Sequence, residues 1–128
     1  MDSIANFLTI VRNGVSTSKP FVSTPHSRMN LAIASILKDE GFIRDVEVTT
    51  EGDFKRIKLV LKYVDGESVI HEITRASKPG RRMYSNIRAV KPVIGGLGLT
   101  ILSTSRGVVT HKKAKALSVG GEVICTVW

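Results

Sequence analysis

The sequence contains little of what several protein classes require. Cys125 is the only cysteine, so no internal disulfide can form, as is usual in the cytoplasm and unusual in small secreted proteins. No apolar run approaches the ~20 residues that span a bilayer, and residues 1–4 lack the basic start and apolar stretch of a secretory signal. We therefore expect a cytoplasmic protein with no membrane partner.

The residue patterns of common catalytic and cofactor sites are also missing. Gly95, Gly96 and Gly98 are followed neither by the Gly-Lys-Ser/Thr of a phosphate-binding loop nor by the third glycine of the dinucleotide fingerprint. The three histidines show no metal-ligand spacing, and one cysteine cannot build a structural zinc site. Ser103 and Ser105 have no base beside them in sequence. We expect no enzymatic activity, no cofactor, no metal and no small-molecule substrate.

Carboxylates are scarce in the C-terminal part of the chain. Residues 1–76 carry ten Lys or Arg and ten Asp or Glu, whereas residues 77–128 carry nine Lys or Arg and a single carboxylate, Glu122. The whole net charge of +8 therefore lies in the second segment. A field this one-sided attracts a polyanion, and no basic amphipathic helix suited to a membrane surface accompanies it. A basic module that binds an acidic protein is the alternative.

In the N-terminal part, apolar spacing predicts two helices and a sheet. Residues three and four apart predict a first helix beginning at Asp2 or Ser3, with Arg12 and Asn13 off its apolar side. Residues 19–25 read as an extended connector with room for one short strand. Ser27 is the expected N-cap of a second helix that ends at Gly41. Alternating residues in 42–50, 54–64 and 67–75 predict a three-stranded antiparallel meander beneath the helices.

In the C-terminal part, residues 97–102 are almost wholly apolar and predict a strand buried on both faces. Residues 103–107 follow as a polar loop of hydroxyls, a guanidinium and a glycine, which suits phosphate, sugar or base-edge contacts. An ordinary serine-rich hairpin is the alternative. We further expect a return strand at 108–109, a helix at 111–117 capped by Thr110, and a closing strand at 122–128.

These elements predict an α+β fold of two small subdomains. The N-terminal one, residues 1–76, has two helices on a three-stranded antiparallel sheet. The basic C-terminal one, residues 77–128, has a short antiparallel sheet with one helix. The chain, at 128 residues and 42% hydrophobic content, is long enough for such an arrangement.

Several blocks of the chain resemble one known family. The segment 95–108 looks like the C-terminal signature of the bacterial eighth protein of the small ribosomal subunit, and 120–128 is similar to that family's ending. Residues 2–14 and 36–43 resemble its first helix and the end of its second. The blocks cover nearly the whole chain in the right order, and the serine-loop and Gly-Gly-Glu blocks are the specific ones.

The resemblance implies a non-catalytic structural component of the small ribosomal subunit. It implies primary binding to the central domain of the small-subunit ribosomal RNA, a role in assembly, and contact with the fifth protein of that subunit. In some bacteria, members of this family also repress their own messenger RNA by binding a mimic of the ribosomal site. We hold that role open as an alternative.

Carried over by position, the resemblance implies specific RNA contacts. The loop would touch the RNA with Tyr84 and Glu122 nearby, the segment before it would add phosphate contacts, and the first helix would supply a second, weaker surface. The expected RNA-binding residues are Ser103, Thr104, Ser105, Arg106, Gly107, Tyr84, Glu122, Lys78, Arg81, Arg82, Arg12 and Asn13. One departure is the start of the third helix, where Lys112 and Lys113 replace the usual acidic residues and oppose the positive end of that helix.

Overall fold

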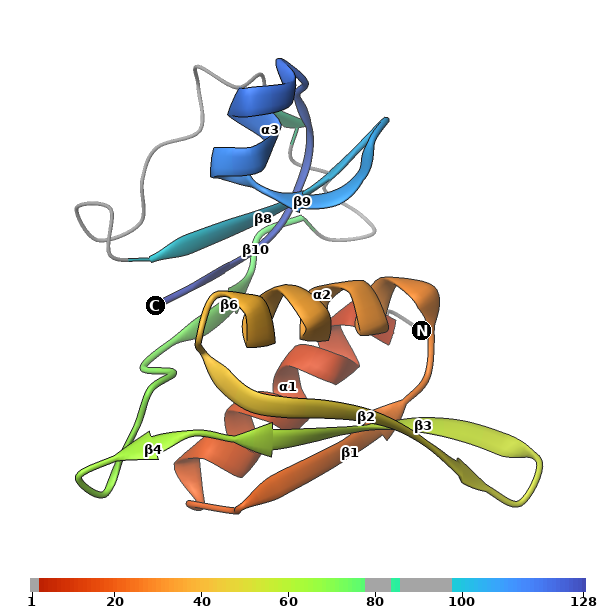
Figure 1. Ribbon diagram of the computed structural model, residues 1–128, viewed down its shortest axis with the longest axis vertical. Coiled ribbons are helices and arrows are strands. Elements are labelled where there is room, and N and C mark those ends of the chain that lie inside the picture. The colour runs from red at the N-terminus through yellow and green to blue at the C-terminus, as the bar shows by residue number, and fades with distance from the viewer. Residues whose placement is uncertain (1–2, 78–83, 86–97) are drawn as a thin grey trace. The chain divides into compact units, whose positions relative to one another are not determined.

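The computed structural model describes residues 3–77, 84–85 and 98–128 (Figure 1). These residues divide into two compact units, 3–71 and 72–128. The first has two helices and a three-stranded sheet, and the second has a short antiparallel sheet with one helix. The predicted α+β class is therefore confirmed. No helix of the described residues is long and apolar enough to cross a membrane.

Two helices form one layer of the first unit. Helix α1 (Ser3–Ser16) buries Phe7, Leu8, Val11 and Gly14, as its apolar spacing predicts. Helix α2 (Arg28–Asp39) begins as expected, because the Ser27 hydroxyl accepts the Asn30 N–H at 3.0 Å. It ends where predicted, since Gly41 adopts φ +82°, a left-handed conformation that glycine tolerates best.

The sheet of the first unit has the strand order β1–β3–β2. It consists of β1 (Phe21–Pro25), β2 (Ile43–Glu51) and β3 (Phe54–Leu61), all pairing antiparallel. Figure 1 shows α1 and α2 on one face of this sheet. The core between these layers includes the buried strand residues Val22, Ile57, Leu59 and Leu61.

The predicted meander was wrong in its third strand. Beyond a short hairpin at its start, segment 67–75 does not pair with 54–64; the connector at 19–25 supplies β1 instead. Residues 63–68 form only a two-residue hairpin, β4 (Tyr63–Val64) with β5 (Glu67–Ser68). Strand β6 (Ile73–Arg75) pairs with the C-terminal strand. The sequence places the subdomain boundary after residue 76, yet β6 lies before that point and belongs to the second unit.

The second unit is built on a five-stranded sheet. Strand β10 (Gly121–Val127) pairs on one side with β6 and β7 (Tyr84–Ser85), and on the other with β8 (Leu99–Thr104). Strand β9 (Gly107–Thr110) pairs with β8 at the edge. Helix α3 (His111–Leu117) packs on β8 and β9, and the Thr110 hydroxyl accepts the Lys113 N–H at its start, as predicted. Residues 99–102 are all buried, as expected for this strand.

A β-bulge interrupts β10. The register with β8 shifts between Val123 and Cys125, so Ile124 is the extra residue and both it and Cys125 are buried. The alternation of side chains that a regular strand would show therefore breaks at this point. The Ile124 carbonyl accepts the Ala76 N–H at 2.9 Å and the Arg75 guanidinium at 3.1 Å. Cys125 is a fully buried core residue, and this burial raises the pKa of its thiol to about 12.

Candidate nucleic-acid interface

The predicted polar loop is shorter than the sequence suggests. Ser103 and Thr104 end β8, and Gly107 opens β9, so only Ser105 and Arg106 lie in the turn. Thr104 is paired with Gly107, and Ser103 with Val108. Gly107 adopts φ +100°, a conformation unfavourable for a residue with a Cβ. The expected loop is thus a tight hairpin turn, which we call the β8–β9 tip (residues 103–107).

The Thr104 side chain closes this tip. Its hydroxyl accepts the Arg106 N–H at 3.0 Å and donates to the Gly107 carbonyl at 2.9 Å. One backbone donor and one backbone acceptor are therefore used within the turn. Thr104 was predicted to contact RNA; the structure commits its hydroxyl to holding the turn.

Exposure separates the residues of the tip into two groups. Ser105, Arg106 and Gly107 are exposed, whereas Ser103 and Thr104 are half-buried. The part of the chain that the structure describes offers no ion-pair partner to Arg106. The guanidinium therefore keeps its charge and its planar set of donors available to an incoming phosphate or base edge.

The strand register brings Glu122 and Tyr84 beside the tip. Glu122 of β10 pairs with Ser103 on one side and with Tyr84 on the other. The Glu122 carboxylate accepts the Ser77 hydroxyl at 2.7 Å, and Ser77 is fully buried. Two candidates far apart in sequence therefore lie in one cross-strand row with Ser103.

Gly121 permits this close arrangement. A Cβ at this position would overlap the Ser103 carbonyl oxygen and would lie 3.1 Å from the Thr104 Cα. Strand β10 thus lies directly against the backbone under the β8–β9 tip, a contact that only glycine allows. Neither Gly120 nor Gly121 has a positive φ, so a left-handed backbone does not explain the glycine at 121. The physical reason for Gly121 is close approach.

Helix α3 adds exposed positive charge to this unit. Lys112, Lys113 and Lys115 are all exposed, and none forms an ion pair with the described residues. Lys78, Arg81 and Arg82, which were also predicted to contact RNA, lie outside the described residues.

The comparisons identify the family to which this unit and the rest of the chain belong. A family model described as "Ribosomal protein S8" matches residues 2–128. The chain belongs to the ribosomal protein S8 family. Small ribosomal subunit protein uS8 of Burkholderia lata is 48% identical over 126 residues, which cover 98% of this chain and 96% of that protein.

Other relatives agree over nearly the full length. Small ribosomal subunit protein uS8c of Thalassiosira pseudonana is 46% identical over 130 residues, covering 99% of this chain and 98% of that protein. Small ribosomal subunit protein uS8 of Rhodopirellula baltica is 48% identical over 129 residues, covering 98% of this chain and 97% of that protein. The resemblance seen in the sequence is therefore confirmed.

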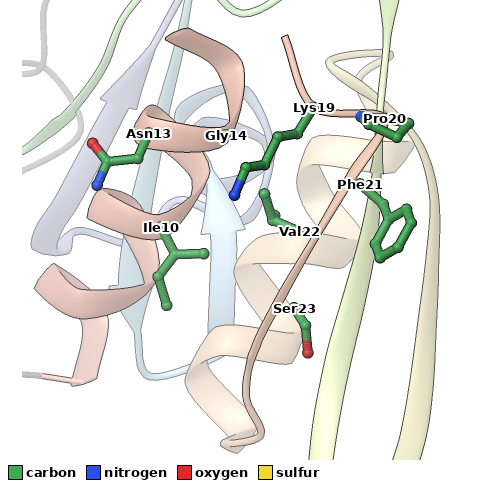
Figure 2. A pocket seen from close by; sticks show the side chains of 8 residues that line it. All are labelled: Ile10, Asn13, Gly14, Lys19, Pro20, Phe21, Val22 and Ser23. Atoms are coloured by element: carbon green, nitrogen blue, oxygen red, sulfur yellow. The ribbon is translucent and has the colours of Figure 1, made fainter. Parts of the chain in front are cut away.

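The first helix of this S8 family member carries the remaining candidates. Arg12 and Asn13 are exposed on α1, as predicted. Asn13 lines a hollow of about 550 Å³ between α1 and β1. Figure 2 shows Lys19 extending across this hollow toward α1. The first unit thus presents a recess of mixed apolar and polar lining that contains one cation, Lys19.

Three features of the site escaped sequence reasoning. The turn-closing role of Thr104 depends on the register of β8 and β9, and the role of Gly121 depends on which strand lies against it. Ser77, the first residue of the predicted basic subdomain, is buried against Glu122. A serine before the Lys-Pro break gave no signal of burial, because its partner lies 45 residues away.

Proposed function

We propose that this chain docks on the central domain of the small-subunit ribosomal RNA through its β8–β9 tip, as an early step in assembly of the subunit. Membership in the S8 family makes it a structural, non-enzymatic component of the small ribosomal subunit, located in the ribosome. The observation that carries the docking proposal is the exposed Ser105–Arg106 turn on a buried strand, braced by Thr104.

The tip suits an irregular RNA element better than a regular helix. The major groove of A-form RNA is too narrow for side chains, and sequence is read mainly at bulges and loops. A turn of two exposed residues is small enough to enter such a widened site. Ser105 supplies a hydroxyl that donates and accepts, and Arg106 supplies charged donors for phosphate or a base edge.

The positive charge of the second unit would attract the phosphate backbone of the RNA, which the shape of the tip alone would not do. The exposed lysines of α3 and Arg106 lie in the same unit as the tip, and cations of this kind bind the phosphate backbone without reading its sequence. Lys78, Arg81 and Arg82 would add to the same field. Glu122 is the exception, and we assign it to accepting a base amino group or to orienting a neighbouring arginine.

Two further contacts belong to the same proposal. Arg12 and Asn13 on α1 form a second, weaker RNA surface, supported by the exposure of both residues. The fifth protein of the small subunit is the proposed protein neighbour. The chain's own messenger RNA is an additional target, because a folded mimic of the ribosomal site would present the same irregular shape to the tip. Competition between a leader transcript and the ribosomal fragment tests that part.

The decisive experiment measures affinity for a transcript of the central domain. Ser105→Ala and Arg106→Ala should each weaken binding by about 1–3 kcal/mol, because each removes contacts that the proposal places at the RNA. Arg44→Ala, an exposed arginine of β2, is the matched control and should leave affinity unchanged. Wild-type affinity for both tip variants would overturn the assignment.

Salt dependence tests the electrostatic part separately. Neutralising about five or six phosphates predicts a slope of roughly −4 to −5 in a plot of log affinity against log salt concentration. A flat response would show that the basic unit is not the docking surface.

A further inference from the structure

Strand β2 leaves one edge of the first sheet open. In the order β1–β3–β2 it is an outer strand, and within the described residues no other strand pairs with its far edge. It is nine residues long, and Figure 1 shows the β2–β3 hairpin reaching beyond the helices that cover the sheet. The side chains at this end are exposed, Val48 by 48% and Phe54 by 76%. Long exposed edges of this kind are templates for another strand.

The backbone groups on this edge can be assigned. The N–H of Val46 donates to the Asp45 carboxylate at 2.8 Å, so it points away from β3. Because N–H groups along a strand point alternately to its two sides, those of Val48 and Thr50 also face outward. The closing pair of the hairpin, Glu51 with Phe54, agrees with this alternation. The backbone N–H and C=O groups of Val48 and Thr50 are therefore available to another strand, whereas the Val46 N–H is already bonded to the Asp45 carboxylate.

The acidic side chains near this edge lie on β2 and the residues that flank it, whereas the paired strand β3 carries Lys55, Arg56 and Lys58. Residues 38–53 carry two basic side chains, Lys38 and Arg44, against six acidic ones: Asp39, Glu40, Asp45, Glu47, Glu51 and Asp53. Two of these carboxylates form ion pairs, Asp45 with Lys38 at 3.2 Å and Glu51 with Arg56 at 3.9 Å. A second copy of the chain would bring the same carboxylates to this edge. The Lys58 ammonium opposite Glu47 lies 4.4 Å from the centroid of the Phe21 ring, and no described cation forms an ion pair with Glu47.

We propose that the open edge of β2 receives an extended, basic segment of a neighbouring protein, which adds a strand to this sheet. Its backbone would pair with Val48 and Thr50. Glu47 and Glu51 project from the same face of β2. Glu51 is paired with Arg56 at 3.9 Å, so a basic residue of the incoming strand would lie beside Glu47. Apolar or β-branched residues on the other face of the incoming strand would lie beside Val48. Strand addition takes affinity from the main chain and specificity from alternate side chains.

This inference deepens the protein-partner side of the proposed function, and hydrogen exchange tests it. The probes are the chain bound to small-subunit RNA alone, and the chain in subunits reconstituted from that RNA and the complete set of small-subunit proteins. We expect exchange of the Val48 and Thr50 amides to slow by roughly tenfold or more only after the proteins are added, because strand pairing protects amides directly. Protection with RNA alone, or no protection in the full subunit, would overturn the proposal.

Matched charge reversals separate this surface from the RNA surface. Glu47→Lys should remove most of the added protection, whereas Glu67→Lys, an exposed glutamate on β5, should leave it intact. Both variants should bind the RNA transcript as wild type does, while Arg106→Ala should weaken RNA binding. The experiment therefore distinguishes a failure of the strand-addition proposal at β2 from a failure of the RNA-docking proposal at the β8–β9 tip. Equal protection in Glu47→Lys and wild type would contradict the assigned role of this carboxylate.

Discussion

The two units use glycine for the same purpose but against different neighbours. In the first, a Cβ on Gly14 of α1 would overlap the Val22 side chain, Cγ1 in particular. In the second, a Cβ on Gly121 would overlap the backbone carbonyl of Ser103. A side chain can change rotamer or shift slightly, whereas a paired strand backbone cannot. The packing of the first unit is therefore more adaptable than the support beneath the β8–β9 tip.

Gly121→Ala should have the largest effect. The added methyl forces β10 away from β8 at Ser103, and we expect the free energy of unfolding to fall by about 2–3 kcal/mol, in the upper range for overpacking. Denaturant unfolding of the variant measures this loss. RNA affinity should also fall, since the row containing Ser103 and Glu122 is displaced. A stable variant with unchanged affinity would show that this backbone is as adaptable as the first unit.

Thr104→Val should affect RNA binding more than stability. The substitution keeps the shape of the side chain but removes the hydroxyl that bonds Arg106 and Gly107. Those backbone groups are exposed, so water compensates much of the loss. The tip becomes less preorganised, and we expect RNA affinity to fall by about 1 kcal/mol. Thr104→Ser, which retains the hydroxyl, is the control and should bind as wild type does.

Gly14→Ala should have a smaller effect than its counterpart in the second unit. Overlap with Val22 is unfavourable, but alanine raises helix propensity by about 1 kcal/mol. We expect a net loss of unfolding free energy of about 1 kcal/mol, and the added change Val22→Ala should recover part of it by making room. RNA affinity at the tip should not change. A loss as large as that of Gly121→Ala would remove the distinction between the two contacts.

The smallest effect concerns Cys125 and appears only at high pH. Its folded pKa is raised by burial to about 12, so the stability linked to the neutral thiol is fully present below an ordinary thiol pKa of about 8.5. It is lost as pH rises from there toward the folded value. The stability difference between wild type and Cys125→Ala should therefore be constant between about pH 6 and about pH 8, because this range lies below the ordinary thiol pKa of about 8.5. The difference should shrink at higher pH. Unfolding curves at successive pH values measure this difference.

Local signals explain which parts of the fold could be predicted. The caps at Ser27 and Thr110 and the helix end at Gly41 depend on a few adjacent residues, and all were correct. Strand pairing depends on distant partners. Residues 21–25 and 73–75 both have apolar, extended character, and only packing decides that one pairs with β3 and the other with β10.

The site divides in the same way. Its location on the buried strand at 99–102 could be read from hydrophobicity, and the exposure of Ser105 and Arg106 agrees with the predicted polar loop. The length of the turn could not be predicted from the sequence, because a strand ending in Ser and Thr has the composition of a loop. The contact between Ser77 and Glu122 joins residues on separate segments, and no local pattern encodes it.

The bulge at Ile124 has a consequence for how this protein can vary. One extra residue in β10 lets both Ile124 and Cys125 enter the core. It also reverses the face of the sheet toward which the side chains before the bulge point. Deleting that residue would leave an equally apolar strand, yet it would turn Glu122 to the opposite face of the sheet. Apart from Gly121, the C-terminal strand should therefore accept changes in the kind of residue far more readily than a change in the number of residues.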